Sequence, residues 1–125
     1  MEPPVSGEAR EVVAAARAWL EELAEEGLDR IPRDPACYVT IDIDGFDPSI
    51  APGTGTPSHG GFLYYEVLEI LQGLAGKGEV VGLDLVEVAP DYDPTGITSF
   101  LAAQLLMNVL GFVFHERSKE GGTAT

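Results

Sequence analysis

Acidic side chains follow directly on an apolar segment near the middle of this 125-residue chain. Residues 38–44 (YVTIDID) have the apolar, β-branched composition of a strand and carry Asp42 and Asp44 at their carboxyl end. Because side chains alternate between the two faces of a strand, we expect these two carboxylates to project together. Two such charges repel each other, and a cation between them relieves the repulsion. Carboxylates are hard oxygen ligands that suit magnesium, calcium or manganese, so this pair is a candidate metal site.

The same aspartates have a second interpretation as turn residues. Asp44 precedes Gly45 and Asp47 precedes Pro48, and both dipeptides are frequent in turns. For Asp47 we favour this structural role over the orientation of a metal ligand. The residues by themselves therefore leave both metal binding and turn formation open for the aspartates.

The elements that must position these residues alternate between helices and strands. The hydrophobic pattern predicts helices ending near Gly27, over residues 64–74 and over about residues 98–117, and strands over residues 38–44 and 80–88. Both strands are apolar along their length, so we expect an α/β fold with a parallel β-sheet and helices on both faces. Ligands of such sheets bind beyond the carboxyl ends of the strands, where Asp42, Asp44 and Glu87 lie. A single domain over residues 1–125 is expected, with flexible ends over residues 1–7 and 118–125.

Composition restricts the partners and the compartment. The net charge of −14 argues against binding to nucleic acid and to anionic membrane surfaces. The most apolar run, residues 101–114, is interrupted by Gln104 and Asn108 and is shorter than a membrane span, so no membrane segment is expected. The only cysteine, Cys37, cannot form a disulfide within the chain, and the first residues do not resemble a signal peptide. We therefore expect a cytoplasmic protein.

Two segments together carry a resemblance to a known family. They are residues 42–61 (DIDGFDPSIAPGTGTPSHGG) and, downstream, residues 82–90 (GLDLVEVAP). In sequence, order and spacing they closely resemble the ureohydrolases, the arginase and agmatinase family. The resemblance implies an arginase-like three-layer α/β/α fold, of which this chain would be the carboxyl-terminal part. A phosphatase of the haloacid dehalogenase type also has Asp-x-Asp after an apolar strand, but Phe46 stands where that family has Thr or Val.

The resemblance also implies a role for each candidate site residue. Asp42 and Asp44 would ligate a binuclear manganese (Mn2+) centre, with nickel (Ni2+) as the other possibility, and such a centre activates water. The reaction would release urea from a guanidino compound such as agmatine, a substrate of polyamine biosynthesis. Glu87 aligns with the glutamate that holds the guanidinium group, which can donate two parallel hydrogen bonds to a carboxylate. Asp84, a charge within an apolar strand, needs a partner and would lie either beside the metal ligands or in a structural ion pair.

Other segments of the family are missing from this chain. The early Gly-Gly-Asp-His and middle Asp-Ala-His-x-Asp segments supply the histidine ligands, and neither occurs; His59 and His115 stand in other contexts. Two aspartates alone would hold a metal weakly. Two hypotheses follow: a metal-dependent amidinohydrolase of which this chain carries part of the site, or an inactive chain that assembles with a partner. Because family members form trimers or hexamers, we also expect a homo-oligomer.

Overall fold

The computed structural model describes residues 25–31 and 36–121, together with Glu11, Ala14, Ala15, Ala18 and Glu22. The chain divides into two compact units, residues 1–31 and 32–125. In the first unit the described residues are helical as far as Asp29, so the helix end predicted at Gly27 is wrong by two residues. The N–H groups of Arg30 and Ile31 donate to carbonyls three residues earlier and close the helix there. Residues 1–7, expected to be flexible, lie outside the described residues.

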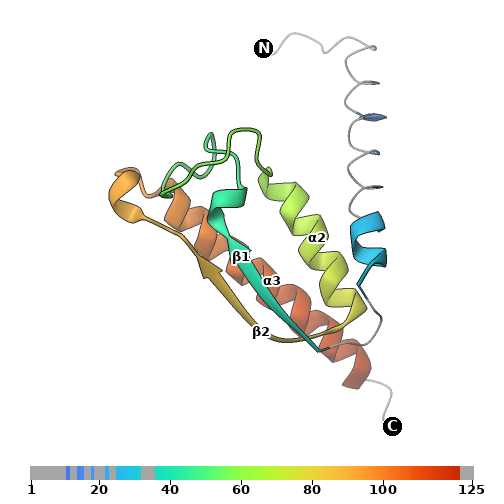
Figure 1. Ribbon diagram of the computed structural model, residues 1–125. Helices are drawn as coiled ribbons and strands as arrows, with labels where there is room; N and C mark the ends of the chain where they lie inside the picture. The colour runs from blue at the N-terminus through green and yellow to red at the C-terminus, as the bar shows by residue number, and fades with distance from the viewer. Residues whose placement is uncertain are drawn as a thin grey trace, which may run out of the picture. The chain divides into compact units, whose positions relative to one another are not determined.

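The second unit alternates strands and helices (Figure 1). Its elements are β1 (Ala36–Asp42), the 3₁₀ turn η1 (Ile43–Gly45), α2 (Tyr64–Lys77), β2 (Glu79–Val86), the 3₁₀ turn η2 (Pro90–Tyr92) and α3 (Ile97–Gly121). The predicted α/β class is confirmed. Both strands end two residues before the predicted position, and both helices continue past theirs.

The two strands pair in parallel, as expected for strands joined by a helical crossover. Their register places Thr40 opposite Asp84 and Asp42 opposite Val86. The carboxyl ends of β1 and β2 therefore meet at one edge of the pair. Ligands of parallel sheets bind beyond this edge, so the predicted site residues are expected here.

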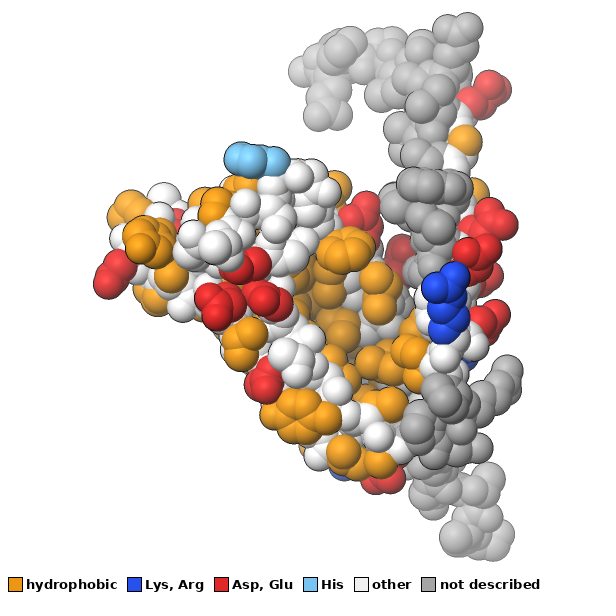
Figure 2. Space-filling model, in the orientation of Figure 1, with side chains coloured by type: hydrophobic (Ala, Val, Ile, Leu, Met, Phe, Trp, Pro, Cys, Tyr) orange, Lys and Arg blue, Asp and Glu red, His pale blue; other side chains and the backbone are white. Residues whose placement is uncertain are grey.

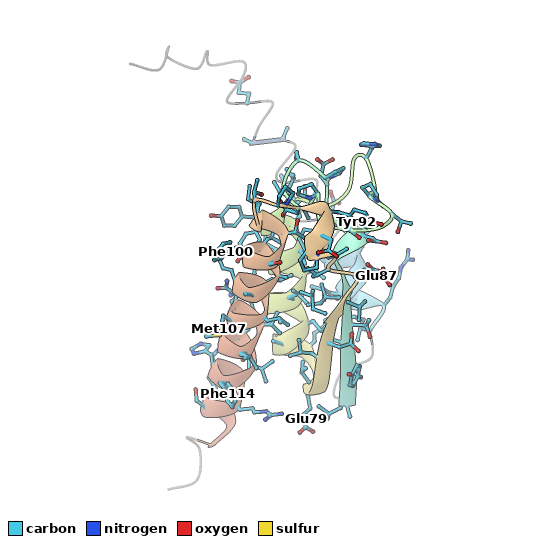
Figure 3. The ribbon with its side chains drawn as sticks, turned by 90° about the vertical axis from the view of Figure 1, so that its left-hand side faces the viewer. Glu79, Glu87, Tyr92, Phe100, Met107 and Phe114 are labelled. Atoms are coloured by element: carbon cyan, nitrogen blue, oxygen red, sulfur yellow. The ribbon has the colours of Figure 1, made fainter. Side chains whose placement is uncertain are left out.

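The two faces of the strand pair differ in their cover. Val39 and Ile41 of β1 and Val80 of β2 are buried in the core that α2 and α3 complete, and Figure 3 shows both helices on one side of the strands. On the other face the side chains of Tyr38 and Val81 are 63% and 57% exposed. The parallel sheet is thus as predicted, but within residues 36–121 the expected second layer of helices is not seen.

The core is centred on α3 and its contact with α2. Leu105 and Val109 of α3 are almost completely buried, and burial of one such side chain stabilises the fold by roughly 1.5–3 kcal/mol. Asn108, a polar residue in this apolar helix, donates from Nδ2 to the Tyr64 hydroxyl of α2 at 2.8 Å. This hydrogen bond satisfies a polar group that would otherwise interrupt the packing of the two helices.

The last helix is longer than the sequence indicated. It continues beyond residue 117, where Lys119 pairs with Glu116 at 2.7 Å and the Ser118 hydroxyl donates to the His115 carbonyl. Residues 118–121, expected to belong to a flexible tail, are therefore helical. Residues 122–125 lie outside the part of the chain that the structure describes.

Helix α3 also corrects the expected absence of a membrane-length apolar segment. By length and composition alone, its residues Ile97–Lys119 could cross a membrane. A helix packed on a sheet can have the same composition, and α3 contacts both α2 and β2. Phe100, Met107 and Phe114 remain exposed along its outer side (Figure 3).

Candidate functional site

The first two candidate ligands lie where β1 ends and turns. Asp42 is the last residue of the strand, and its Oδ1 accepts a hydrogen bond from the Asp44 N–H at 2.9 Å. This contact caps η1, so Asp44 lies in the 3₁₀ turn and not in the strand. The prediction that both carboxylates extend from one strand is therefore wrong, because the side chain of Asp42 ends the strand itself. Both aspartates nevertheless lie at the carboxyl end of β1.

The carboxylate of Asp44 has one satisfied and one unsatisfied oxygen. Its Oδ2 accepts a hydrogen bond from the Thr56 hydroxyl, which the following loop brings back to the turn. Its Oδ1 is buried and has no hydrogen-bond partner in the structure. A buried carboxylate oxygen without a donor is costly, and a cation would compensate it. The donor set of Asp44 therefore fits a metal ligand.

Asp47 organises the loop that follows. Its two carboxylate oxygens accept hydrogen bonds from the N–H groups of Ser49 and Gly60, both at 2.9 Å. Hydrogen bonding by Ser49, followed by that of the Gly60 N–H, holds the pKa of Asp47 below its ordinary value. The structural role favoured for Asp47 from the sequence is confirmed.

The loop closes on itself at a short parallel bridge between Phe46 and Phe62. The Phe62 N–H donates to the Gly45 carbonyl at 2.8 Å, and the Asp47 N–H donates to the Phe62 carbonyl at 3.0 Å. A Cβ on Gly61 would lie only 2.6 Å from the Gly45 carbonyl oxygen. Glycine is therefore required at position 61 for the loop to return past the metal-ligand candidates.

Glu87 follows β2 directly and lies at the same edge as Asp42. Its φ of 67° is the only positive φ of a non-glycine residue among the described residues. This left-handed backbone ends β2 at Val86, so the strand predicted to reach residue 88 is two residues too long. Such strain is concentrated at functional sites, and Figure 3 shows Glu87 at the carboxyl end of the strand.

Asp84 has a partner of a kind that the sequence did not suggest. The Tyr38 hydroxyl donates to its Oδ2 at 3.1 Å, and the tyrosine ring reaches it by lying over Gly82. This hydrogen bond and the negative charge of Asp84 raise the pKa of Tyr38. The other oxygen, Oδ1, is buried without a hydrogen-bond partner. Asp84 is thus held by a phenol, and its predicted position beside metal ligands stays a prediction.

Acidic side chains gather over the carboxyl ends of the strands, on the face of the strand pair that α2 and α3 do not cover, beside exposed apolar side chains (Figure 2). Within the described residues, however, no group of three or more His, Cys, Asp or Glu side chains could hold a metal ion. Asp42 and Asp44 therefore form an incomplete ligand set.

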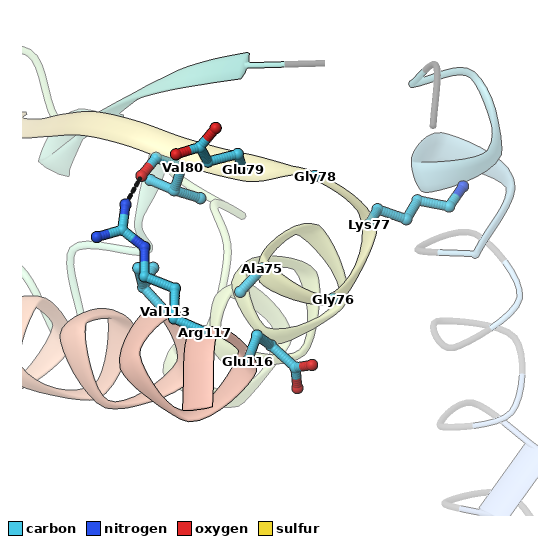
Figure 4. Close-up of a pocket in the computed structure, with 9 residues that line it drawn as sticks. All are labelled: Ala75, Gly76, Lys77, Gly78, Glu79, Val80, Val113, Glu116 and Arg117. Atoms are coloured by element: carbon cyan, nitrogen blue, oxygen red, sulfur yellow. Dashed lines mark hydrogen bonds between the residues drawn. The ribbon is translucent and has the colours of Figure 1, made fainter. Parts of the chain in front are cut away.

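A separate hollow of about 580 Å³ lies at the other end of β2 (Figure 4). The ends of α2 and α3 line it with the first residues of the strand. In it, Arg117 of α3 donates to the Val80 carbonyl at 3.0 Å, which ties the helix to the strand. Because Glu87 follows the opposite end of the same strand, this hollow is not part of the candidate site.

Comparison with known proteins decides the family. The sequence model of the Arginase family matches residues 9–111. This chain belongs to the arginase family. It is 46% identical over 102 residues to a guanidinobutyrase of Pseudomonas aeruginosa. The aligned region covers 79% of this chain and 31% of that protein. It is 44% identical over 102 residues to a mitochondrial agmatinase of Gallus gallus, covering 79% and 29% of the two chains.

The similarity extends to three dimensions. The structure of a hypothetical agmatinase from Burkholderia thailandensis superposes with a TM-score of 0.69 at 40% identity, covering 81% of this chain and 33% of that chain. The chain therefore spans about a third of the length of these relatives.

In this arginase-family chain the structure brings three of the four predicted site residues, Asp42, Asp44 and Glu87, to one edge of the strand pair. It adds Thr56, which the sequence did not single out as a partner of Asp44. The signal for Thr56 was weak, because a threonine in a glycine-rich loop has many possible partners and the contact spans 12 residues.

Proposed function

We propose that this arginase-family chain carries part of the site of a metal-dependent amidinohydrolase, which releases urea from a guanidino compound. Asp42 and Asp44 would hold the metal, with manganese as first choice and nickel as second. When bound, the metal supplies a water activated near neutral pH. The buried, unpartnered Oδ1 of Asp44 is the observation that supports this proposal most directly.

The residues of this chain would divide the remaining tasks. The Thr56 hydroxyl, by donating to Oδ2 of Asp44, fixes the carboxylate and leaves Oδ1 available to a cation. Glu87 would accept two parallel hydrogen bonds from the guanidinium group and so orient the substrate. Relatives named guanidinobutyrase and agmatinase support a guanidino substrate, for which agmatine is our first choice. We further propose a homo-oligomer, a trimer or hexamer.

A second candidate function is that of an assembly component without activity of its own. The incomplete ligand set among the described residues favours it. So does the exposed face of the strand pair, where Tyr38 and Val81 are solvent-exposed and where, within residues 36–121, the sheet consists of β1 and β2 alone. Such edges and faces bind further polypeptide readily.

The two candidates are distinguished by urea release from agmatine and from 4-guanidinobutyrate in the presence of manganese. The first predicts urea release that is lost in Glu87→Gln and retained in Glu79→Gln, a matched charge change at the other end of β2. The second predicts no urea from the purified chain, together with capture of a longer polypeptide. Self-association does not separate the two candidates, because a homo-oligomer is proposed for the first as well. Urea release that is equal in both variants would contradict the role of Glu87.

A further inference from the structure

The glycine-rich loop is tied down at Gly53 through both of its backbone polar groups. The Gly53 N–H donates to Oγ1 of Thr98 at 2.7 Å, and its carbonyl accepts from the Ala89 N–H at 2.8 Å. Thr98 belongs to the first turn of α3, and Ala89 lies two residues after Glu87. Gly53 is therefore hydrogen-bonded to both segments that follow β2 at this edge.

The Thr98 side chain that holds Gly53 is itself fixed by Asp93. Asp93 and Thr98 are 5% and 1% exposed. The Thr98 N–H donates to Oδ2 of Asp93 at 2.7 Å, and Thr95 donates to Oδ1 through its hydroxyl and its N–H. Hydrogen bonds from the Thr95 hydroxyl and then from the Thr98 N–H lower the pKa of Asp93 to about 2, so this carboxylate is ionised near neutral pH.

No side chain fits at position 53. A Cβ there would lie 2.8 Å from both Cβ of Asp93 and Oγ1 of Thr98. The close approach of the loop backbone to the side chains of Asp93 and Thr98 therefore depends on glycine. The contact is built from buried groups with matched donors and acceptors, so it has one geometry.

We propose that Gly53, Asp93 and Thr98 form a positioning unit that sets the candidate metal ligands relative to Glu87. On one side, Gly53 leads within three residues to Thr56, the partner of Asp44. On the other side, the Gly53 carbonyl accepts the hydrogen bond from the Ala89 N–H and so fixes the backbone that follows Glu87. None of the three residues would touch metal or substrate; they act through Thr56 and Ala89. The inference rests on the proposed function for its consequence, but not for its geometry.

The geometric part is tested by amide hydrogen exchange on the whole chain. Thr98→Val keeps the shape of the side chain and removes the acceptor of the Gly53 N–H, whereas Thr98→Ser keeps the hydroxyl. We expect Thr98→Val to speed exchange at Gly53 and Ala89 at least about ten-fold relative to the amides of β1, and Thr98→Ser to restore most of the protection. Val109→Ala, which removes core packing within α3, should speed exchange without selecting these two amides. If the Ala89 amide in Thr98→Val keeps its protection from exchange relative to the amides of β1, the proposal is overturned.

The functional part is tested by manganese affinity measured by electron paramagnetic resonance. We expect Thr98→Val to weaken manganese binding by about three- to ten-fold and Thr98→Ser to restore it, as for loss of one positioning hydrogen bond. Asp44→Asn tests the proposed function separately. If Asp44→Asn leaves binding unchanged, the proposed function fails while the exchange result still decides the positioning unit. If Asp44→Asn abolishes binding and Thr98→Val does not weaken it, the positioning unit has no functional role and the inference fails.

Discussion

Glu87 combines an exposed carboxylate with a left-handed backbone, and two substitutions separate these properties. Its φ is 67°, a conformation in which any Cβ approaches the following carbonyl oxygen. Glu87→Ala removes the carboxylate and keeps the Cβ, whereas Glu87→Gly removes both. The difference in stability between the two variants therefore reports the backbone, and their shared loss of function reports the carboxylate.

The size of the stability difference follows from two opposing effects. A Cβ in the left-handed region costs roughly 1–2 kcal/mol, and glycine loses about 0.5–1 kcal/mol more conformational entropy on folding. We therefore expect Glu87→Gly to be about 0.5–1 kcal/mol more stable to unfolding than Glu87→Ala. Because the Glu87 side chain is exposed, little packing is lost in either variant.

The assay is thermal unfolding followed by circular dichroism. Chemical denaturation is avoided because the usual denaturants, urea and guanidinium, are the proposed product and a relative of the proposed substrate. For a chain of this length the expected difference is an unfolding temperature about 2–4 °C higher for Glu87→Gly than for Glu87→Ala. Both variants should also lose any stabilisation by agmatine in the presence of manganese. Equal stability of the two variants, or a more stable Glu87→Ala, would refute the claim that the backbone at residue 87 is strained. Stabilisation by agmatine in either variant would refute the role of the Glu87 carboxylate in substrate binding.

Three further predictions concern the loop, the core and pH. Gly61→Ala places a Cβ 2.6 Å from a carbonyl oxygen and should destabilise by roughly 1–3 kcal/mol in thermal unfolding, whereas Gly55→Ala, with nothing within 4 Å, should not. Leu105→Ala, at a fully buried position, should cost about 2–5 kcal/mol, and the exposed Met107→Ala less than about 0.5 kcal/mol. Since the pKa of Asp93 lies at about 2, below the ordinary 3.8, its ionised form stabilises the fold above that ordinary value. The difference in unfolding temperature between the unaltered chain and Asp93→Asn should therefore shrink as pH falls through about 2.

The sequence predicted the strands well and their ends poorly. Apolar, β-branched runs identify β1 and β2 because burial requires them. The ends of the strands depend on single residues, and the hydrophobic pattern does not reveal the effect of a single residue. Asp42 ends β1 because its own side chain accepts the Asp44 N–H, and Glu87 ends β2 because its backbone is left-handed.

The contacts that complete the site could not be predicted from spacing. Thr98 and Gly53 are 45 residues apart and meet only because α3 packs beside the loop. A local signal did exist for the start of α3, where Asp93 precedes Thr95 and an apolar run, as capping residues do. That signal identifies the cap of a helix, but not the loop residue that the cap would hold.

Manganese binding by the purified chain decides whether Asp42 and Asp44 are metal ligands. Saturable binding is expected, weak because two aspartates are an incomplete ligand set. It should be lost in the double variant Asp42→Asn/Asp44→Asn and retained in Asp91→Asn, an exposed acid of η2. Electron paramagnetic resonance of free manganese during titration measures this. Equal binding by all three proteins would contradict the assignment of Asp42 and Asp44 as metal ligands.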